Sequence, residues 1–251
     1  MHPILITFNL LGKDVLLGTY GLFMVAGFGA AALISIRRAR RYGYRPGDFF
    51  NYLALVGAGA VGGALLAGFL LFLPERIDHR YADFPPVFVS WGGILGGIAA
   101  LALAASRWKK SFLGLADIIA PGYLVGLGIG RIGCFFAGCC YGVHTATCVG
   151  VVFLDPAAPA AAMRQPLVPT QLISALILAG AGTALLFGRF RKMNTGFLFS
   201  LSAIVYSVSR FTIELWRDDP RVFLWGLSDG QLFSIVYFAL GVGVLLYAVK
   251  K

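Results

Sequence analysis

Two arginines lie close to the ends of apolar segments, where their side chains could bind an anion. Arg131 lies in GLGIGRIGCFFAGCCYG and Arg210 in VYSVSRFTIELWRDD. A guanidinium beside hydrocarbon is costly unless an anionic group meets it, so such residues mark candidate functional sites. Arginine also grips planar or tetrahedral oxyanions through two parallel hydrogen bonds. The pair predicts a site for a phosphate-bearing molecule that is itself partly apolar, a description that fits a phospholipid.

The composition is that of a helical membrane protein. Of the 251 residues, 59% are hydrophobic and 13% are charged, and the mean hydropathy is +0.82. A soluble domain has about 45–50% apolar and about 25% charged residues. The apolar runs are about 20 residues long, which favours membrane-spanning helices over the alternating segments of about 10 residues in a β-barrel. We expect an all-α helix bundle that forms a single transmembrane domain over residues 1–251, and the 33 glycines favour close helix packing.

Seven apolar segments are predicted to span the membrane. They cover residues 15–36, 50–73, 90–105, 112–130, 169–188, 196–213 and 230–249. The third is short and begins with the glycine-rich SWGGILGG, so we expect a tilted or broken helix there. A cleaved signal peptide is not expected, because no basic region precedes the first apolar stretch and no small-residue cleavage site follows it.

The basic residues are concentrated in alternate connections between these segments. Thirteen of the 21 lysines and arginines lie in four short stretches, at residues 37–45, 107–110, 189–192 and 250–251. The positive-inside rule places these stretches in the cytoplasm. The N-terminus and the long segment at 131–168 then face outside, and the C-terminus is cytoplasmic. This distribution accounts for the net charge of +10 without a nucleic-acid partner.

The residues around both arginines resemble the motifs of a known family. GRIGCFFAGCCYG (residues 130–142) is similar to the signature GRxGNFxNxExxG of the bacterial prolipoprotein diacylglyceryl transferases. Six further elements resemble the family's motifs in the same order: TYGLFMVAGF, SWGGILGG, ADIIAP, PTQL, YSVSRFTIELWRDD and SDGQLFS. They run from the first predicted span to the last, so the resemblance extends over nearly the whole chain.

The resemblance implies a reaction at the outer face of the bacterial inner membrane. Members of the family transfer the diacylglyceryl group of phosphatidylglycerol to the lipobox cysteine thiol of a preprolipoprotein, forming a thioether and releasing glycerol phosphate. The implied partners are phosphatidylglycerol, the lipobox-containing preprolipoprotein and membrane lipids, with no cofactor and no metal. The orientation derived from the charged connections agrees with an active site toward the periplasm.

The resemblance also implies roles for individual residues. Arg131 and Arg210 would contact the lipid phosphate, where fixed cations stabilise charge on the leaving oxygens. Tyr206 would hydrogen-bond the headgroup and Glu214 would orient an arginine; both lie on the helix face of Arg210. The other positions matched to substrate or lipid binding are Tyr20, Gly92, Gly93, Asp117, Gly142, Gln171 and Arg217.

Each of these residue types also has a purely structural explanation. Arginines near helix ends snorkel to the membrane surface, and tyrosines gather at the membrane interface. Glu214 and Arg217 could form an ordinary ion pair, and the glycines could serve packing alone.

Three departures from the family pattern concern thiol chemistry. Trp91 replaces a family histidine, Cys134 replaces the signature asparagine, and Val168 replaces the histidine before PSQL. A free cysteine has a pKa of about 8.5 and attacks as the thiolate. Another group must therefore promote deprotonation. The cationic site of the two arginines could do so, or His144 could act as the base, although His144 also fits an ordinary loop residue.

The four cysteines all lie in the expected outer segment: Cys134, Cys139, Cys140 and Cys148. No histidine falls at standard zinc spacing, so the spacing specifies a metal site only weakly. A disulfide of Cys139 or Cys140 with Cys148, packing thiols, and a covalent intermediate on Cys134 all remain open.

Three functions are compatible with paired arginines in a seven-span protein. The first is the diacylglyceryl transfer of the family. The second is a paralogue that uses a phospholipid donor with a different acceptor, which the changes at Trp91 and Cys134 motivate. The third is a non-catalytic protein that binds or transports lipid. We favour the transferase, because the motif resemblance is specific to that family.

Overall fold

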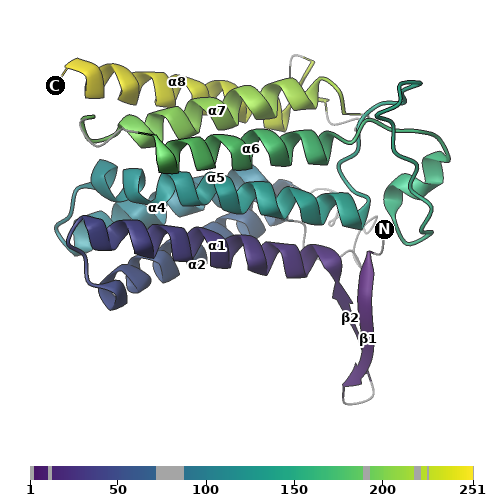
Figure 1. Cartoon of the computed structure of the whole chain (residues 1–251), viewed down its shortest axis with the longest axis horizontal. Helices are drawn as coiled ribbons and strands as arrows, with labels where there is room; N and C mark the ends of the chain where they lie inside the picture. Colours follow the sequence, from purple (N-terminus) through teal and green to yellow (C-terminus); the bar gives the residue numbers. More distant parts are fainter. Residues whose placement is uncertain are drawn as a thin grey trace. The chain divides into compact units, whose positions relative to one another are not determined.

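The computed structural model describes the whole chain except residues 1–2, 11–12, 72–87, 189–192, 218–221, 225 and 251. The described residues form an all-α bundle with two short hairpins (Figure 1). The helices are α1 (Thr19–Arg41), α2 (Pro46–Leu71), α4 (Ser90–Arg107), α5 (Phe112–Ala137), α6 (Thr170–Phe187), α7 (Phe197–Glu214) and α8 (Asp229–Lys250). The antiparallel strand pairs are β1 (Ile4–Leu10) with β2 (Lys13–Gly18), and β3 (Val222–Leu224) with β4 (Leu227–Ser228).

Each predicted span corresponds to one helix, with shifted ends. Residues 15–18 belong to β2, so the first helix begins at Thr19. The fourth continues past residue 130 to Ala137 and therefore carries Arg131 within the helix. The break expected in residues 90–105 was wrong, because α4 is one uninterrupted helix.

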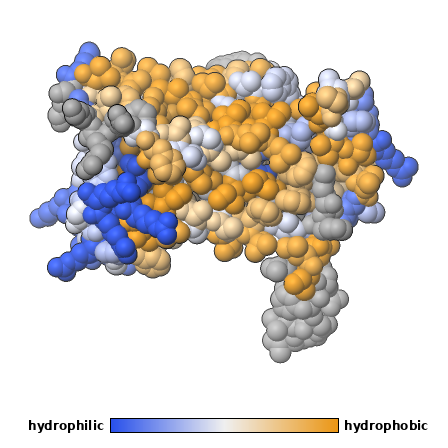
Figure 2. Space-filling view, viewed as in Figure 1, coloured by the Kyte–Doolittle hydropathy of each residue, from blue (hydrophilic) through white to orange (hydrophobic). Residues whose placement is uncertain are grey.

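The helices have the length and composition of membrane spans. Among those in the described residues, six are long and apolar enough to cross a membrane. The exception is α4, whose four glycines and terminal Arg107 lower the hydropathy of its 18 residues. The chain is therefore a multi-pass membrane protein. Apolar side chains cover most of the visible helix surfaces, and hydrophilic ones lie toward the ends of the helices (Figure 2). The helix α1 ends in a basic turn.

The bundle consists of two compact units. One contains Met1–Ser35 and Ile119–Lys251, and the other contains Ile36–Ile118. In the first unit, α6, α7 and α8 run side by side (Figure 1), and α7 is the most buried of the six candidate spans. Close approach of α1 to α5 requires glycine, because a β-carbon on Gly126 would lie 2.6 Å from the Gly27 carbonyl oxygen.

The second unit is built on α2 packed against α4. Glycines face one another across this contact: a β-carbon on Gly96 would overlap the Gly59 carbonyl oxygen, and one on Gly63 would overlap that of Gly92. The tight packing expected from the glycine content is confirmed here, since small residues let helix backbones approach closely.

Connections predicted to share a membrane side meet within each unit. In the second unit, Lys110 Nζ lies 5.6 Å from the centre of the Tyr44 ring, so the connections after α1 and after α4 lie at one end. In the first, Asn194 Nδ2 donates a hydrogen bond of 2.7 Å to the Ala248 carbonyl, which joins the α6–α7 connection to the end of α8. The basic residues Arg189, Arg191, Lys192 and Lys251 lie outside the described residues.

Candidate functional site

A backbone ladder fixes the chain between α5 and α6 against the end of α7. The Gly142 amide donates to the Val168 carbonyl at 3.0 Å, and the Val143 amide donates to the Trp216 carbonyl at 2.8 Å. A β-carbon on Gly142 would lie 2.8 Å from the Trp216 oxygen and equally close to the Thr170 methyl group. Only glycine fits there, and the ladder brings residues 139–142 beside the first turn of α6 and the end of α7.

The side chains around this ladder line a closely packed pocket in the first unit, called the cavity below, which in this structure is too narrow for a water molecule. Arg131 comes from the last two turns of α5, Arg210 from α7, and Arg217 from just beyond α7. The remaining lining residues are Cys140, Thr170, Gln171, Ser174 and Ile213. The described lining thus contains three guanidinium groups and no carboxylate, which is the electrostatic environment of an anion site.

Glu214 does not line the cavity, but it forms ion pairs with two of the three arginines. Its Oε2 atom lies 2.8 Å from Arg210 Nη1 and 3.4 Å from Arg217 Nη1. All three side chains are at least nine-tenths buried. One carboxylate fixes two cations and neutralises the charge of one, so the cluster keeps a positive charge that a bound anion would offset.

Glycine also makes room for Arg210 at the start of α8. A β-carbon on Gly230 would lie 2.7 Å from Arg210 Nη2. The guanidinium therefore occupies the space that any other residue at position 230 would fill. Sequence reasoning did not single out Gly230, although it lies in the SDGQLFS motif.

Two buried polar side chains of α6 hold the loop that enters the cavity. Thr170 Oγ1 donates to the Cys140 carbonyl at 2.7 Å, and Gln171 Nε2 donates to the Cys139 carbonyl at 2.7 Å. The other Gln171 polar atom, Oε1, is buried and accepts no hydrogen bond within the described structure. It is an acceptor available to a hydroxyl group of a ligand.

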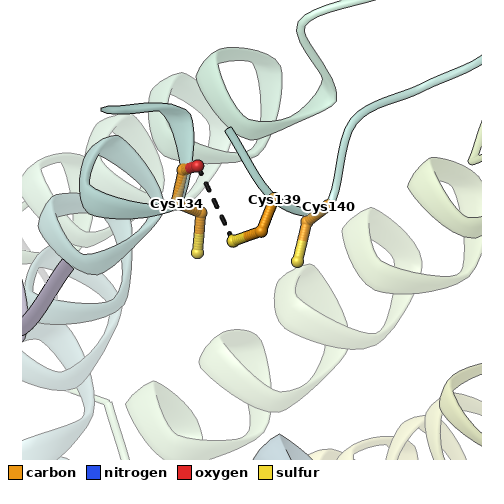
Figure 3. Close-up of side chains that lie close together, drawn as sticks. All are labelled: Cys134, Cys139 and Cys140. Carbon is orange, nitrogen blue, oxygen red and sulfur yellow. Dashed lines mark hydrogen bonds between the residues drawn. The ribbon is translucent and has the colours of Figure 1, made fainter. Parts of the chain in front are cut away.

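Three cysteines gather beside this loop (Figure 3). Cys134 lies in the last turn of α5, whereas Cys139 and Cys140 follow the turn at Gly138. Their sulfur atoms all lie within 4.8 Å of one another, and the Cys139 thiol donates to the Cys134 carbonyl at 3.7 Å. All four cysteines of the chain are described and all are free thiols, so the disulfide considered with the exposed Cys148 is absent from this structure.

Hydrogen bonds within the cluster give Cys139 and Cys140 unequal pKa values. Hydrogen bonds from the Cys134 and Cys139 thiols hold the pKa of Cys140 well below its usual range, and the nearby Arg131 acts in the same direction. Hydrogen bonds with the Cys134 and Cys140 thiols, together with burial, raise the pKa of Cys139. Cys140 is therefore the member that most readily carries a negative charge, and it is the one that lines the cavity.

Two tyrosines predicted for the site lie near it but do not line the cavity. The buried Tyr206 of α7 packs in an aromatic cluster, with ring centres 6.4 Å from Tyr123 and 5.9 Å from Tyr237. Tyr20, in the first turn of α1, lies within electrostatic range of Arg131. Their roles toward the lipid headgroup stay predictions.

The other predicted residues have different surroundings. Gly92 and Gly93 belong to the second unit and face α2, and the backbone carbonyls of Asp117 and Ile118 accept hydrogen bonds from Arg38 in that unit. His144 is exposed, with its Nδ1 atom 3.1 Å from the Pro166 carbonyl, and lies outside the cavity lining. Its assignment as the base remains a prediction.

Fold and site together define a multi-pass helical membrane protein with a buried cluster of three arginines. The chain belongs to the prolipoprotein diacylglyceryl transferase family, whose pattern matches residues 6–247. It is 36% identical over 236 residues to phosphatidylglycerol–prolipoprotein diacylglyceryl transferase 2 of Clostridium perfringens, covering 93% of this chain and 91% of that protein. It is 32% identical over 258 residues to phosphatidylglycerol–prolipoprotein diacylglyceryl transferase of Clostridium tetani, covering 100% of this chain and 98% of the relative.

Proposed function

We propose that this protein transfers the diacylglyceryl group of phosphatidylglycerol to the lipobox cysteine of a preprolipoprotein. Family membership supports the reaction class, and the names of the relatives supply the donor and the acceptor. The observation that carries the assignment is the cavity lined by Arg131, Arg210 and Arg217. It provides the cationic, buried environment that a phosphate leaving group requires.

The arginines would act on the phosphate while the acceptor thiolate attacks the glyceryl carbon. The new sulfur–carbon bond forms as the carbon–oxygen bond to phosphate breaks, and the electron pair of that bond leaves on the phosphate oxygen. Fixed cations stabilise this developing charge without reorganising, and they are most effective where water is excluded. Glu214 would keep Arg210 and Arg217 in place during the transfer.

The reaction is proposed to take place at the outer face of the bacterial inner membrane. Basic connections on alternate sides support this orientation through the positive-inside rule. The segment between α5 and α6, which includes the cavity-lining Cys140, would then face the periplasm.

The experiment that tests the function is transfer to a synthetic acceptor. Purified protein is incubated with phosphatidylglycerol and a lipobox peptide, and the peptide mass is expected to increase by one diacylglyceryl unit on its thiol. Arg131→Ala and Arg210→Ala should each reduce the rate about 100- to 1,000-fold, because each removes a cation from the leaving phosphate.

Arg164→Ala is the matched control, because Arg164 is an exposed arginine of the same unit outside the cavity lining. It should transfer at the wild-type rate. Near-normal rates in both cavity variants would contradict the role of the arginines. Lipid turnover with another acceptor only would favour the paralogue, and binding of lipid without turnover would favour a non-catalytic protein.

A further inference from the structure

The three clustered cysteines have the composition and spacing of a metal site. A turn brings them together: Gly138 and Cys140 both have positive φ, of 68° and 60°, and the chain folds back so that Cys139 and Cys140 meet Cys134 (Figure 3). Positive φ is uncommon for a residue other than glycine. The spacing in the sequence does not reveal this geometry, because it depends on the turn.

The sulfur separations suit a thiophilic ion. A tetrahedral zinc ion with zinc–sulfur bonds of about 2.3 Å places its sulfur ligands about 3.8 Å apart. The three sulfur atoms lie within 4.8 Å of one another, so an adjustment of about 1 Å or less brings them to that separation. The buried side chains of Gln171 and Thr170 donate hydrogen bonds to the carbonyls of Cys139 and Cys140 and so limit the movement of both ligands.

We propose that Cys134, Cys139 and Cys140 bind one Zn²⁺ ion and leave its fourth position open toward the arginine-lined cavity. The grouping of candidate ligands in the described chain contains these three residues and no histidine or carboxylate. Three protein ligands with one open position are typical of catalytic rather than structural zinc sites. Cys140 belongs to the cluster and also lines the cavity with Arg131 and Arg210, so the open position would adjoin the place proposed for the lipid phosphate.

Such an ion would activate the acceptor thiol, a role that rests on the proposed function. None of the described cavity-lining residues is a histidine or a carboxylate that could take the thiol proton. A thiol that coordinates zinc is deprotonated outright. The acceptor thiol would displace zinc-bound water and release its proton to solvent. Its sulfur would then attack the glyceryl carbon as the carbon–oxygen bond breaks and the electron pair leaves on the phosphate oxygen. Zinc keeps its oxidation state throughout.

Metal binding is tested on the full-length protein in detergent, reduced and stripped with a chelator. Zn²⁺ is titrated in competition with a chromophoric chelator, and Cd²⁺ is added separately to record thiolate-to-metal charge-transfer absorption. We expect one ion per chain. Cys134→Ser, Cys139→Ser and Cys140→Ser should each weaken binding about 100-fold or more, because each removes one of three ligands.

Cys148→Ser is the matched control, because Cys148 is an exposed thiol outside the cluster. It should bind Zn²⁺ like the wild type. Helix content and a single elution peak show whether each variant is folded. The site is excluded if the reduced wild type shows no saturable binding, or if a variant lacking all three cluster cysteines binds equally well. A disulfide within the cluster combined with no zinc binding after reduction would also overturn it.

Activity measurements separate this inference from the proposed function. Diacylglyceryl transfer should fall at least about tenfold on removal of the ion and recover with Zn²⁺ but not with Mg²⁺, since hard cations prefer oxygen ligands. Full-rate transfer by metal-free protein would overturn the role of zinc and leave the proposed function standing. If zinc binds as expected but no lipobox peptide is modified, the proposed function fails and with it the role of zinc in thiol activation, while the binding site itself stands.

Discussion

At the residue scale, Arg210 shows how a cation is held in a site with little access to water. Its Nη1 atom pairs with Glu214 at 2.8 Å on one helix face. On another side, Gly230 lacks the β-carbon that would approach the guanidinium to 2.7 Å. The position of the charge is therefore set by one attractive contact and one absent side chain.

Gly230→Ala should displace the Arg210 guanidinium without unfolding α8. The clash involves the far end of a flexible side chain, so the arginine moves rather than the backbone. A misplacement of about 1 Å at a reacting centre can cost about 100-fold in rate, and we expect a loss of diacylglyceryl transfer of about that size with little change in melting temperature. Gly243→Ala, in the same helix with no atom within 4 Å of the added carbon, should leave the rate unchanged. Equal rates in the two variants would contradict this role for Gly230.

The sequence singled out the arginines of the candidate site, but neither the convergence of its thiols nor the contact at Gly230. Arg131 and Arg210 could be singled out because an arginine in an apolar segment needs an anionic partner. The four cysteines were recognised as a group, but the convergence of three of them could not be predicted, because it depends on the backbone turn at Gly138. Gly230 was not identified either, since its position beside the Arg210 side chain of α7 is visible only in three dimensions.

At the scale of elements, glycine determines how closely α2 and α4 approach. The glycine-rich start of α4 was expected to break or tilt the helix. The helix is unbroken, and this stretch packs closely against α2: a β-carbon on Gly92 would lie 2.6 Å from the Gly63 carbonyl oxygen. Intrinsic helix propensity is a weak signal, and the contact with the neighbouring helix overrides it. The approximate extent of the long helices in the described residues, by contrast, followed from the length of the apolar runs.

Gly96→Ala should destabilise the packing of α2 against α4. The added carbon would overlap the Gly59 carbonyl oxygen and lie 2.9 Å from the Gly63 α-carbon, so backbone must move. Overpacking of this kind costs about 1–3 kcal/mol, and we expect thermal denaturation in detergent at a temperature lower by several degrees. Gly97→Ala is the control, because its nearest atom would lie at an ordinary 3.7 Å. A melting temperature of Gly96→Ala no lower than that of Gly97→Ala would show that the helix contact tolerates the extra carbon.

At the scale of the whole molecule, the concentration of basic residues in alternate connections predicts how the chain is oriented in the membrane. The sequence predicted that the basic connections share one side, and within each unit the connections concerned do meet. The helix ends could be predicted only approximately, because apolar residues continue past them: residues 15–18 form a strand, and α5 continues to Ala137. By the positive-inside rule, the charge pattern also predicts which connections face the cytoplasm, which the packing of the helices alone cannot do.

Cys148 provides a native reporter of that orientation. It is exposed in the connection between α5 and α6, which is proposed to face the periplasm. A membrane-impermeant maleimide added to intact spheroplasts should label the protein, and Cys148→Ser should lose most of the label because the other three thiols are less exposed. Lys109→Cys, introduced into Cys148→Ser in an exposed basic connection, should react only after permeabilisation. Protection of Cys148 until the membrane is opened would reverse the orientation, and would place the arginine cavity and its proposed acceptor on opposite sides of the membrane.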